Sequence, residues 1–180
     1  MKNAKLNVWI LTGLTLVLGV LMAVLNLSPS WSQSAGNSHD FLLYGCLFCI
    51  SSALMIASFA HPEKDKEISN FPILGTIRLE HSFRLTAYFF GGVIACSVNS
   101  ELWLIETLHL IFTALAITSG YIGLMLYPDT DKGHTYALIG FVFGVGGFLI
   151  GYIFGWYSIA WGEVLASIPL AVFMLKTWKN

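Results

Sequence analysis

The stretch Val8–Leu27 reads VWILTGLTLVLGVLMAVLNL, a run of twenty residues with no charged side chain. An α-helix of this length spans the roughly 30 Å hydrocarbon core of a bilayer. Lys2 and Lys5 precede the run, as basic residues do in a secretory signal peptide, but the apolar part of a signal peptide is only about 7–15 residues long. The stretch therefore predicts a helix that spans a membrane.

Further apolar segments of similar length follow the first. They lie at about 41–60, 84–99, 102–127, 135–156 and 158–176. Apolar residues make up 56% of the 180 residues and charged residues only 11%, against roughly 25% charged in a soluble domain. The net charge is −1 and no basic run occurs, so nucleic acid is not an expected partner. The sequence predicts an all-α membrane protein: one domain over residues 1–180, built as a bundle of six transmembrane helices.

The basic residues predict how this bundle is oriented. All nine Lys and Arg residues fall on one side of a six-span arrangement, at positions 2, 5, 64, 66, 78, 84, 132, 176 and 179. The loops on the other side, 28–40, 99–102 and 156–158, contain none. Because cytoplasmic loops carry an excess of Lys and Arg, we predict that both termini are cytoplasmic. The expected location is the cell (inner) membrane, which the chain crosses several times.

Five ionisable residues stand inside the predicted spans or at their lip, all towards the outer end. Such residues are costly in a membrane and are functional candidates by default. Glu106 and His109 are three residues apart and share one face of their helix. Glu163 lies about one turn into the last helix, and His39 and Asp40 lie at the lip of the second. At a rise of about 1.5 Å per residue, the five are predicted to form one polar pocket.

Three interpretations of this pocket stay open. It could bind the polar end of a lipid-like or small amphipathic ligand, with His39 and Asp40 at its mouth. It could instead hydrolyse or transfer a lipid headgroup or acyl chain, with Glu106, His109 and Glu163 as acid/base candidates, although no nucleophile motif accompanies them. It could also be structural, because hydrogen bonds between membrane helices are worth about 0.6–2 kcal/mol. The sequence does not decide whether the chain is an enzyme.

Glu106, His109 and Glu163 are also the candidate ligands of a metal. A Glu-x-x-His motif with a further carboxylate supplies nitrogen and oxygen donors that suit zinc or iron. The motif occurs once, however, and di-iron bundles use two. Haem is disfavoured, because His39 and His109 lie at different depths and bis-His ligation needs matching ones. The other three histidines fall at cytoplasmic helix ends, where we expect them to be solvated: His61, His81 and His134.

Glycines recur along the fifth predicted helix at steps of four, three, four and four residues. They are Gly140, Gly144, Gly147, Gly151 and Gly155. This spacing places a smooth groove on one helix face, which a neighbouring backbone can approach closely. It favours packing within the bundle. The alternatives are a seam with a second copy of the chain, a groove for a lipid tail, or contact with a subunit of a larger membrane complex, of which this protein would be a structural component.

Cys46 and Cys49 form a CxxC pair inside an apolar segment, and Cys96 is the third cysteine. Membrane thiol oxidoreductases relay electrons through a second pair, which a single remaining cysteine cannot supply. Buried cysteine commonly acts as a small apolar residue. The sequence favours this structural role and leaves the redox activity of Cys46 and Cys49 undecided.

Three short places carry a resemblance to a known family: Ser38–Gly45 (SHDFLLYG), Leu108-His109 and Trp161-Gly162-Glu163. They resemble the bacterial six-helix DUF998 family, which is related in form to the Frag1/DRAM/Sfk1 group, and the likeness covers about 30–175. The chain departs from the family pattern at His39/Asp40, where Asn is frequent, and lacks the Arg expected near Glu163. The resemblance implies that His109 and Glu163 matter beyond packing. The link of Frag1-like proteins to lipid-anchor remodelling makes membrane lipids the expected partners.

Overall fold

The computed structural model describes residues 2–25, 41–72, 75–96, 103–127, 130–154 and 159–178. Within these ranges the protein is mostly helical, with six α-helices and one two-stranded sheet. The helices are α1 (Lys2–Leu25), α3 (Phe41–Ala60), α4 (Leu79–Ala95), α5 (Trp103–Met125), α6 (Thr130–Phe154) and α7 (Ile159–Thr177). The strands are β1 (Glu67–Phe71) and β2 (Gly75–Arg78). Each of the six predicted segments corresponds to one helix, so the mostly helical prediction is confirmed.

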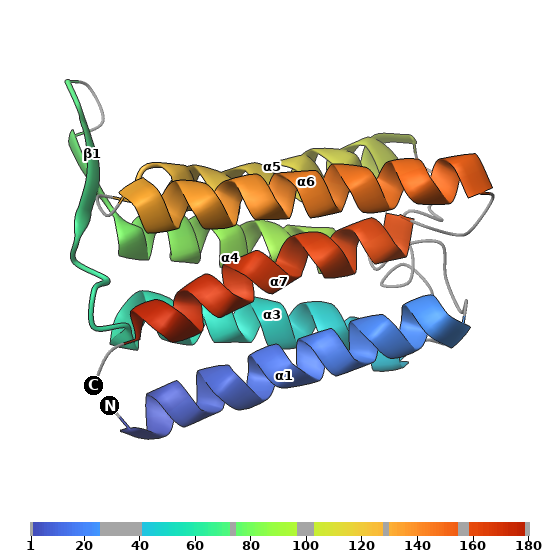
Figure 1. The fold of residues 1–180 in the computed structure, drawn as a ribbon, viewed down its shortest axis with the longest axis horizontal. Helices are drawn as coiled ribbons and strands as arrows, with labels where there is room; N and C mark the ends of the chain where they lie inside the picture. The colour runs from blue at the N-terminus through green and yellow to red at the C-terminus, as the bar shows by residue number, and fades with distance from the viewer. Residues whose placement is uncertain are drawn as a thin grey trace.

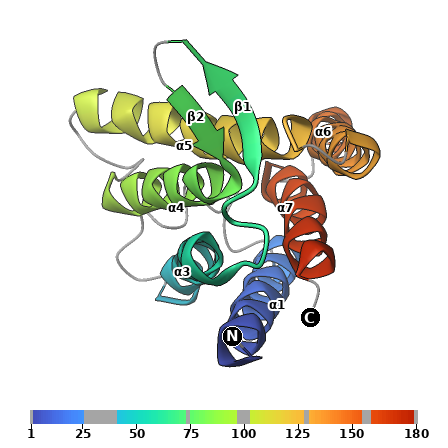
Figure 2. The same cartoon turned by 90° about the vertical axis from the view of Figure 1, so that its left-hand side faces the viewer.

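The helices lie roughly side by side along the long axis of the molecule and run in alternating directions (Figure 1). Helix α1 packs against α3 and α7, and α4 packs against α3 and α5. Helix α6 contacts α7 and α5, so the helices form a closed ring around the axis of the bundle (Figure 2). The hairpin and both ends of the chain lie at the same end of the bundle (Figure 1). We call this the hairpin end, and the opposite end, where α4 stops and α5 starts, the far end.

The apolar core lies between α3, α4 and α7. Its largest fully buried side chains include Ile50, Leu54, Leu79, Phe173 and Met174. Two glycines bring α4 and α5 close together. A Cβ on Gly123 would lie 2.0 Å from Oγ of Ser82, and one on Gly92 would lie 2.6 Å from Cγ of Phe112. A larger residue at either position would push the two helices apart.

The β1–β2 hairpin departs from the all-α prediction. Its strands pair antiparallel, with Phe71 opposite Gly75 beside the tip. Gly75 has a φ of 73°, a left-handed conformation that costs glycine little and other residues more. The segment contains the turn-forming residues Pro72 and Gly75, but its strands of five and four residues are too short to show a clear alternation of apolar and polar residues. Backbone bonds join the hairpin to α4, including Leu79 N–H to Lys66 O at 2.9 Å.

Two helices are long and apolar enough, by length and composition, to cross a membrane: Lys2–Leu21 within α1, and α5. Shorter apolar stretches in the described residues are Gly45–Ala60 and Ile168–Thr177. Core helices of soluble proteins can pass the same test, but those are mostly buried. The apolar windows of α1 and α5 are only 22% and 29% buried, so most of their side chains face outwards.

Candidate functional site

The first part of the candidate site is His109, in the second turn of α5. The side chain is 1% exposed. Its Nδ1 lies 2.7 Å from the carbonyl oxygen of Cys96, the residue that caps the C-terminal end of α4. A carbonyl oxygen can only accept, so Nδ1 carries the proton and donates it. This hydrogen bond fixes both the tautomer and the orientation of the ring.

The close approach of α4 and α5 positions this ring. Gly92 lies one turn before Cys96 and accepts the Cys96 N–H at 3.0 Å. Because Gly92 has no side chain, Phe112 of α5 can lie against the α4 backbone. The Phe112 ring also packs on Phe89, with centroids 6.4 Å apart. Aromatic packing on one side and the Cys96 carbonyl on the other therefore hold this turn of α5 in place.

The second ring nitrogen of His109, Nε2, is buried and has no hydrogen-bond partner among the described residues. With the proton on Nδ1, Nε2 of the neutral ring is a lone-pair acceptor. A buried acceptor without a partner costs about 1–3 kcal/mol. A histidine held by its other N–H on a backbone carbonyl is also how metal-bound histidines are commonly oriented. The arrangement can receive a donor from a ligand, or a metal ion.

The other predicted site residues are described only in part. Glu106 and Glu163 lie in helices α5 and α7, as predicted, but their side chains are outside the described residues. His39 and Asp40 lie outside them altogether. The pocket formed by all five residues therefore stays a prediction. Among the side chains that are described, no group of three or more His, Cys, Asp or Glu could hold a metal ion, and the metal prediction is likewise untested.

A buried histidine at the hairpin end was not expected from the sequence. His61 is 1% exposed, so the prediction that it is solvated is wrong. Its Nδ1 accepts the backbone N–H of Glu63 at 3.1 Å, and Nε2 therefore donates, 3.1 Å from Oγ1 of Thr177 and 3.3 Å from the carbonyl oxygen of Met174. Burial lowers the pKa of His61 to about 4. The neutral ring ties the end of α3 to the end of α7.

A cluster of polar side chains stabilises the position of the loop that follows α3. The hydroxyl of Tyr127, a residue 2% exposed, donates to the carboxylate of Glu63. The ammonium of Lys66 lies 3.2 Å from the same hydroxyl and 4.4 Å above the Tyr127 ring. Nearby, Arg84 pairs with Glu80 at 3.2 Å, which agrees with the helical spacing of these two residues. Among the described residues, two buried side-chain nitrogens have no hydrogen-bond partner: Nε of Arg84 at the hairpin end, whose guanidinium pairs with Glu80 through another nitrogen, and Nε2 of His109 at the far end.

The glycine and cysteine motifs are partly described. A Cβ on Gly140 would lie 2.3 Å from the hydroxyl oxygen of Tyr121. The absence of a side chain at Gly140 therefore lets Tyr121 of α5 pack against α6. Four further members of the predicted glycine face have surroundings outside the described residues: Gly144, Gly147, Gly151 and Gly155. Cys46 is buried in α3, and its thiol donates to the carbonyl oxygen of Thr15 in α1 at 3.3 Å. The short distance indicates a packing role for Cys46.

Comparison with known proteins identified no relative of the chain. No protein-family model, no curated protein and no solved structure matches the chain. Membership of the DUF998 family therefore stays a prediction, and the function has to be argued from the site itself.

Proposed function

We propose that this chain is an integral protein of the inner membrane that binds a lipid-like or small amphipathic ligand at the far end of the bundle. All six helices cross the bilayer, and both termini are cytoplasmic. The ligand's polar end lies at His109, with Glu106 and Glu163 beside it and His39 and Asp40 at the mouth. The far end then faces the outer leaflet.

Outward-facing apolar side chains support the membrane placement. Soluble monomers rarely expose contiguous apolar patches beyond a few hundred Å². Here large apolar side chains more than half exposed occur on five helices, among them Trp9, Val17, Phe48, Tyr88, Trp103, Leu138, Phe141 and Ile153. A bilayer covers such side chains without cost, and water does not. The exposure extends to helices other than α1 and α5, which supports the six-span arrangement.

The distribution of charge supports the orientation. Every Lys and Arg of the described residues belongs to the hairpin-end part of its element: the start of α1, the segment from α3 to α4, the first turn of α6 or the last turn of α7. The two termini lie at this end as well (Figure 1). The cytoplasmic side of a membrane protein is the side enriched in Lys and Arg, so the hairpin end is the cytoplasmic one.

Nε2 of His109 has no hydrogen-bond partner in the described part of the chain, and this is the observation that carries the ligand site. If His109 served packing alone, the bond to Cys96 would be sufficient, and an apolar residue would fill the remaining space without leaving an acceptor buried. A ligand headgroup with a hydroxyl or ammonium donor would satisfy Nε2. Amphipathic ligands combine such a donor with an apolar body that the surrounding helices and lipid can cover.

Two substitutions of His109 separate ligand binding from a structural role. In His109→Asn the side-chain amide nitrogen reaches about as far as Nδ1, so the bond to Cys96 is retained and Nε2 is lost. In His109→Gln the amide reaches about as far as Nε2, and the bond to Cys96 is lost. Native mass spectrometry of protein purified in mild detergent would measure the amphiphile that each variant retains, and thermal melting would measure stability.

We expect His109→Asn to melt like the wild type and to retain the amphiphile roughly tenfold less well, the size of one buried hydrogen bond to a ligand. His109→Gln should melt at a lower temperature. Equal retention of the amphiphile by the wild type and His109→Asn, with equal stability, would show that Nε2 contacts no ligand and would contradict the proposal.

The orientation of His109 on the Cys96 carbonyl favours one second candidate, a metal-dependent lipid hydrolase or transferase that uses the same site. Elemental analysis of the purified wild type beside His109→Asn distinguishes it. A stoichiometric metal that is lost in the variant would favour this second candidate. Without a metal in the wild type, ligand binding alone remains as the account of the site.

A further inference from the structure

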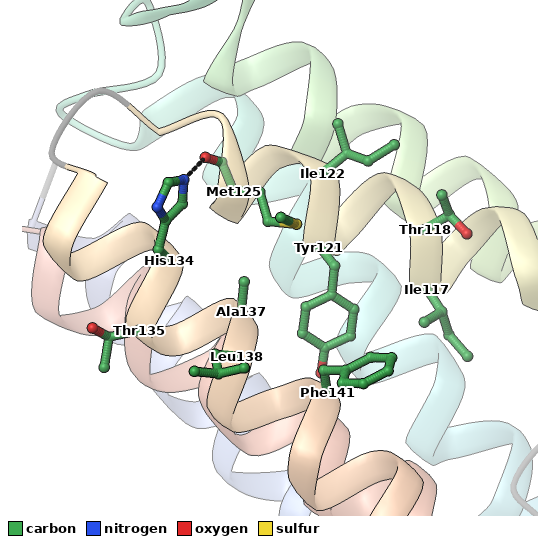
Figure 3. Close-up of a pocket in the computed structure, with 10 residues that line it drawn as sticks. All are labelled: Ile117, Thr118, Tyr121, Ile122, Met125, His134, Thr135, Ala137, Leu138 and Phe141. Atoms are coloured by element: carbon green, nitrogen blue, oxygen red, sulfur yellow. Dashed lines mark hydrogen bonds between the residues drawn. The ribbon is translucent and has the colours of Figure 1, made fainter.

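A groove of about 850 Å³ runs between α5 and α6 in the half of the bundle nearer the hairpin end. Figure 3 shows its walls: Ile122 and Met125 project from α5, and Leu138 and Phe141 from α6. These four side chains are 48–65% exposed, so the groove opens on the outer surface of the bundle. Its volume lies within the roughly 300–1,000 Å³ range of pockets that take small-molecule ligands.

The groove forms because α5 and α6 touch at only a few glycine positions. A Cβ on Gly133 would lie 2.2 Å from the carbonyl oxygen of Leu124, and one on Gly140 would meet the Tyr121 hydroxyl. The two backbones approach at Gly133, and at Gly140 the Tyr121 side chain packs against the backbone of α6. On the outer side longer side chains hold the surfaces apart and leave the space open, so the groove results from the packing of the two helices.

His134 stands with Thr135 at the hairpin end of this largely apolar groove, which Thr118 and Tyr121 also line. His134 lies in the first turns of α6, and its Nε2 is 2.7 Å from the carbonyl oxygen of Met125, at the end of α5 (Figure 3). Because the carbonyl accepts, Nε2 carries the proton, and Nδ1 of the neutral ring is an acceptor. The imidazole is exposed and lies where the interface would be, if the hairpin end faces the cytoplasm. A largely apolar groove with the His134 acceptor at the interface matches an amphiphile with a donor in its headgroup.

We propose that this groove binds one acyl chain of a phospholipid from the cytoplasmic leaflet, with a headgroup ammonium N–H donated to Nδ1 of His134. The proposal rests on the membrane placement argued above, but it uses residues in the opposite half of the bundle from His109. An ethanolamine headgroup has N–H donors, whereas a choline headgroup has none, so the site distinguishes the two lipids by hydrogen bonding. The apolar walls of the groove contact the acyl chain and do not distinguish one headgroup from another.

The test is native mass spectrometry of the full chain in mild detergent, titrated with an ethanolamine phospholipid and with the choline phospholipid that has the same acyl chains. Leu138→Trp fills the groove from the α6 wall. The matched control is Val142→Trp, because Val142 is exposed on α6 and does not line the groove. In His134→Gln the amide reaches about as far as Nε2, so the contact with Met125 is retained and the Nδ1 acceptor is lost.

We expect the wild type and Val142→Trp to retain one lipid and to prefer ethanolamine over choline roughly two- to tenfold, the effect of one hydrogen bond. Leu138→Trp should lose both lipids, and His134→Gln should bind both equally. If Leu138→Trp proves unstable on melting, Ile122→Trp fills the groove from the α5 wall in its place.

Three results would overturn the proposal. The first is equal lipid retention by Leu138→Trp and Val142→Trp. The second is a wild type that binds the two headgroups equally. The third is disulfide cross-linking between two chains that carry Leu138→Cys, because that would show that a second copy of the chain occupies the groove. Loss of binding in His109→Asn with the groove site intact would concern the far end alone, so the two sites are tested independently.

Discussion

His61 and His109 are buried to the same extent, each 1% exposed, but their hydrogen bonding differs. Both nitrogens of His61 have partners within the protein: the Glu63 N–H on Nδ1, and the Thr177 hydroxyl and Met174 carbonyl on Nε2. Among the residues that the structure describes, His109 has a partner on Nδ1 alone. A buried polar group without a partner calls for an explanation, and a bound ligand is one. This contrast is why the proposal places a ligand at His109 and gives His61 a structural role.

His61 should make the stability of the protein depend on pH. Burial lowers its folded-state pKa to about 4, while an unfolded histidine titrates near 6.5. Between these two pKa values the unfolded state binds more protons than the folded state. The contribution of His61 to the free energy of unfolding is therefore fully present above about pH 6.5 and is lost as the pH falls towards 4. The loss approaches roughly 3 kcal/mol at the low end. Thermal melting in detergent between pH 7.5 and pH 4 would measure it.

His61→Gln is the control for this pH dependence. The glutamine amide reaches about as far as Nε2 and can donate to Thr177, but it does not titrate. The variant should melt below the wild type at pH 7.5, because the Glu63 N–H loses its acceptor, and the two melting temperatures should converge as the pH falls. A constant difference across the whole pH range would contradict the assignment of the titration to His61.

The sequence predicted only part of the candidate site. It singled out His109 together with Glu106, because ionisable residues in an apolar run are conspicuous. It could not show that Nδ1 donates to Cys96 or that Nε2 is left over, because both depend on how closely α4 approaches α5. His61 was misjudged for a related reason: it directly follows a helix end, and only the packing of α7 and Trp178 over it makes it a core residue.

At the scale of the elements, two adjacent glycines of α4 allow a matched test of helix packing. A Cβ on Gly92 would lie 2.6 Å from the Phe112 ring, whereas one on Gly91 would meet nothing within 4 Å. We expect Gly92→Ala to lower the free energy of unfolding by about 1–3 kcal/mol through overpacking. Gly91→Ala should be neutral or stabilise by up to about 1 kcal/mol, because alanine is the better helix former. Chemical unfolding in detergent would measure both.

Two results would contradict this account of α4. Equal effects of the two substitutions would show that Phe112 moves aside freely, and a stabilised Gly92→Ala would show that the helices are not in tight contact there. Because Gly92 also accepts the N–H of Cys96, Gly92→Ala should weaken the site at His109 as well. Retention of amphiphile by the same variants would report that coupling.

The helices were predictable from the sequence and the hairpin was not. Each long apolar run exceeds what a strand would use, and its length and lack of charge indicate a helix. The segment Glu67–Arg78 has strands of only five and four residues, too short for a clear alternation. Its pairing depends on the turn at Gly75 and on the backbone bonds from Leu79 to Lys66, which join residues distant along the chain. Backbone bonds of this kind leave no recognisable pattern in the local sequence.

At the scale of the whole molecule, the alternating helices give the bundle two different ends. The hairpin end holds the basic residues and the paired polar groups of His61, Glu63 and Tyr127. The far end holds Nε2 of His109, which no described residue contacts by a hydrogen bond, and the loops assigned to this end carry no Lys or Arg. A polar pocket can face the outer leaflet only if the hairpin end is cytoplasmic, so the orientation and the proposed ligand site depend on each other.

Cysteine labelling of intact cells measures this orientation directly. With the native cysteines replaced by alanine, Ser32→Cys places a thiol in the predicted outer loop 28–40, and Asp65→Cys places one on the hairpin side, where the Asp65 side chain is 63% exposed. A membrane-impermeant maleimide should label Ser32→Cys in intact cells and Asp65→Cys only after permeabilisation. The reverse pattern would place the far end in the cytoplasm and His109 at the inner leaflet. Labelling of both in intact cells would contradict the six-span arrangement. In that arrangement one span, α3, lies between positions 32 and 65, so the two thiols must lie on opposite sides of the membrane.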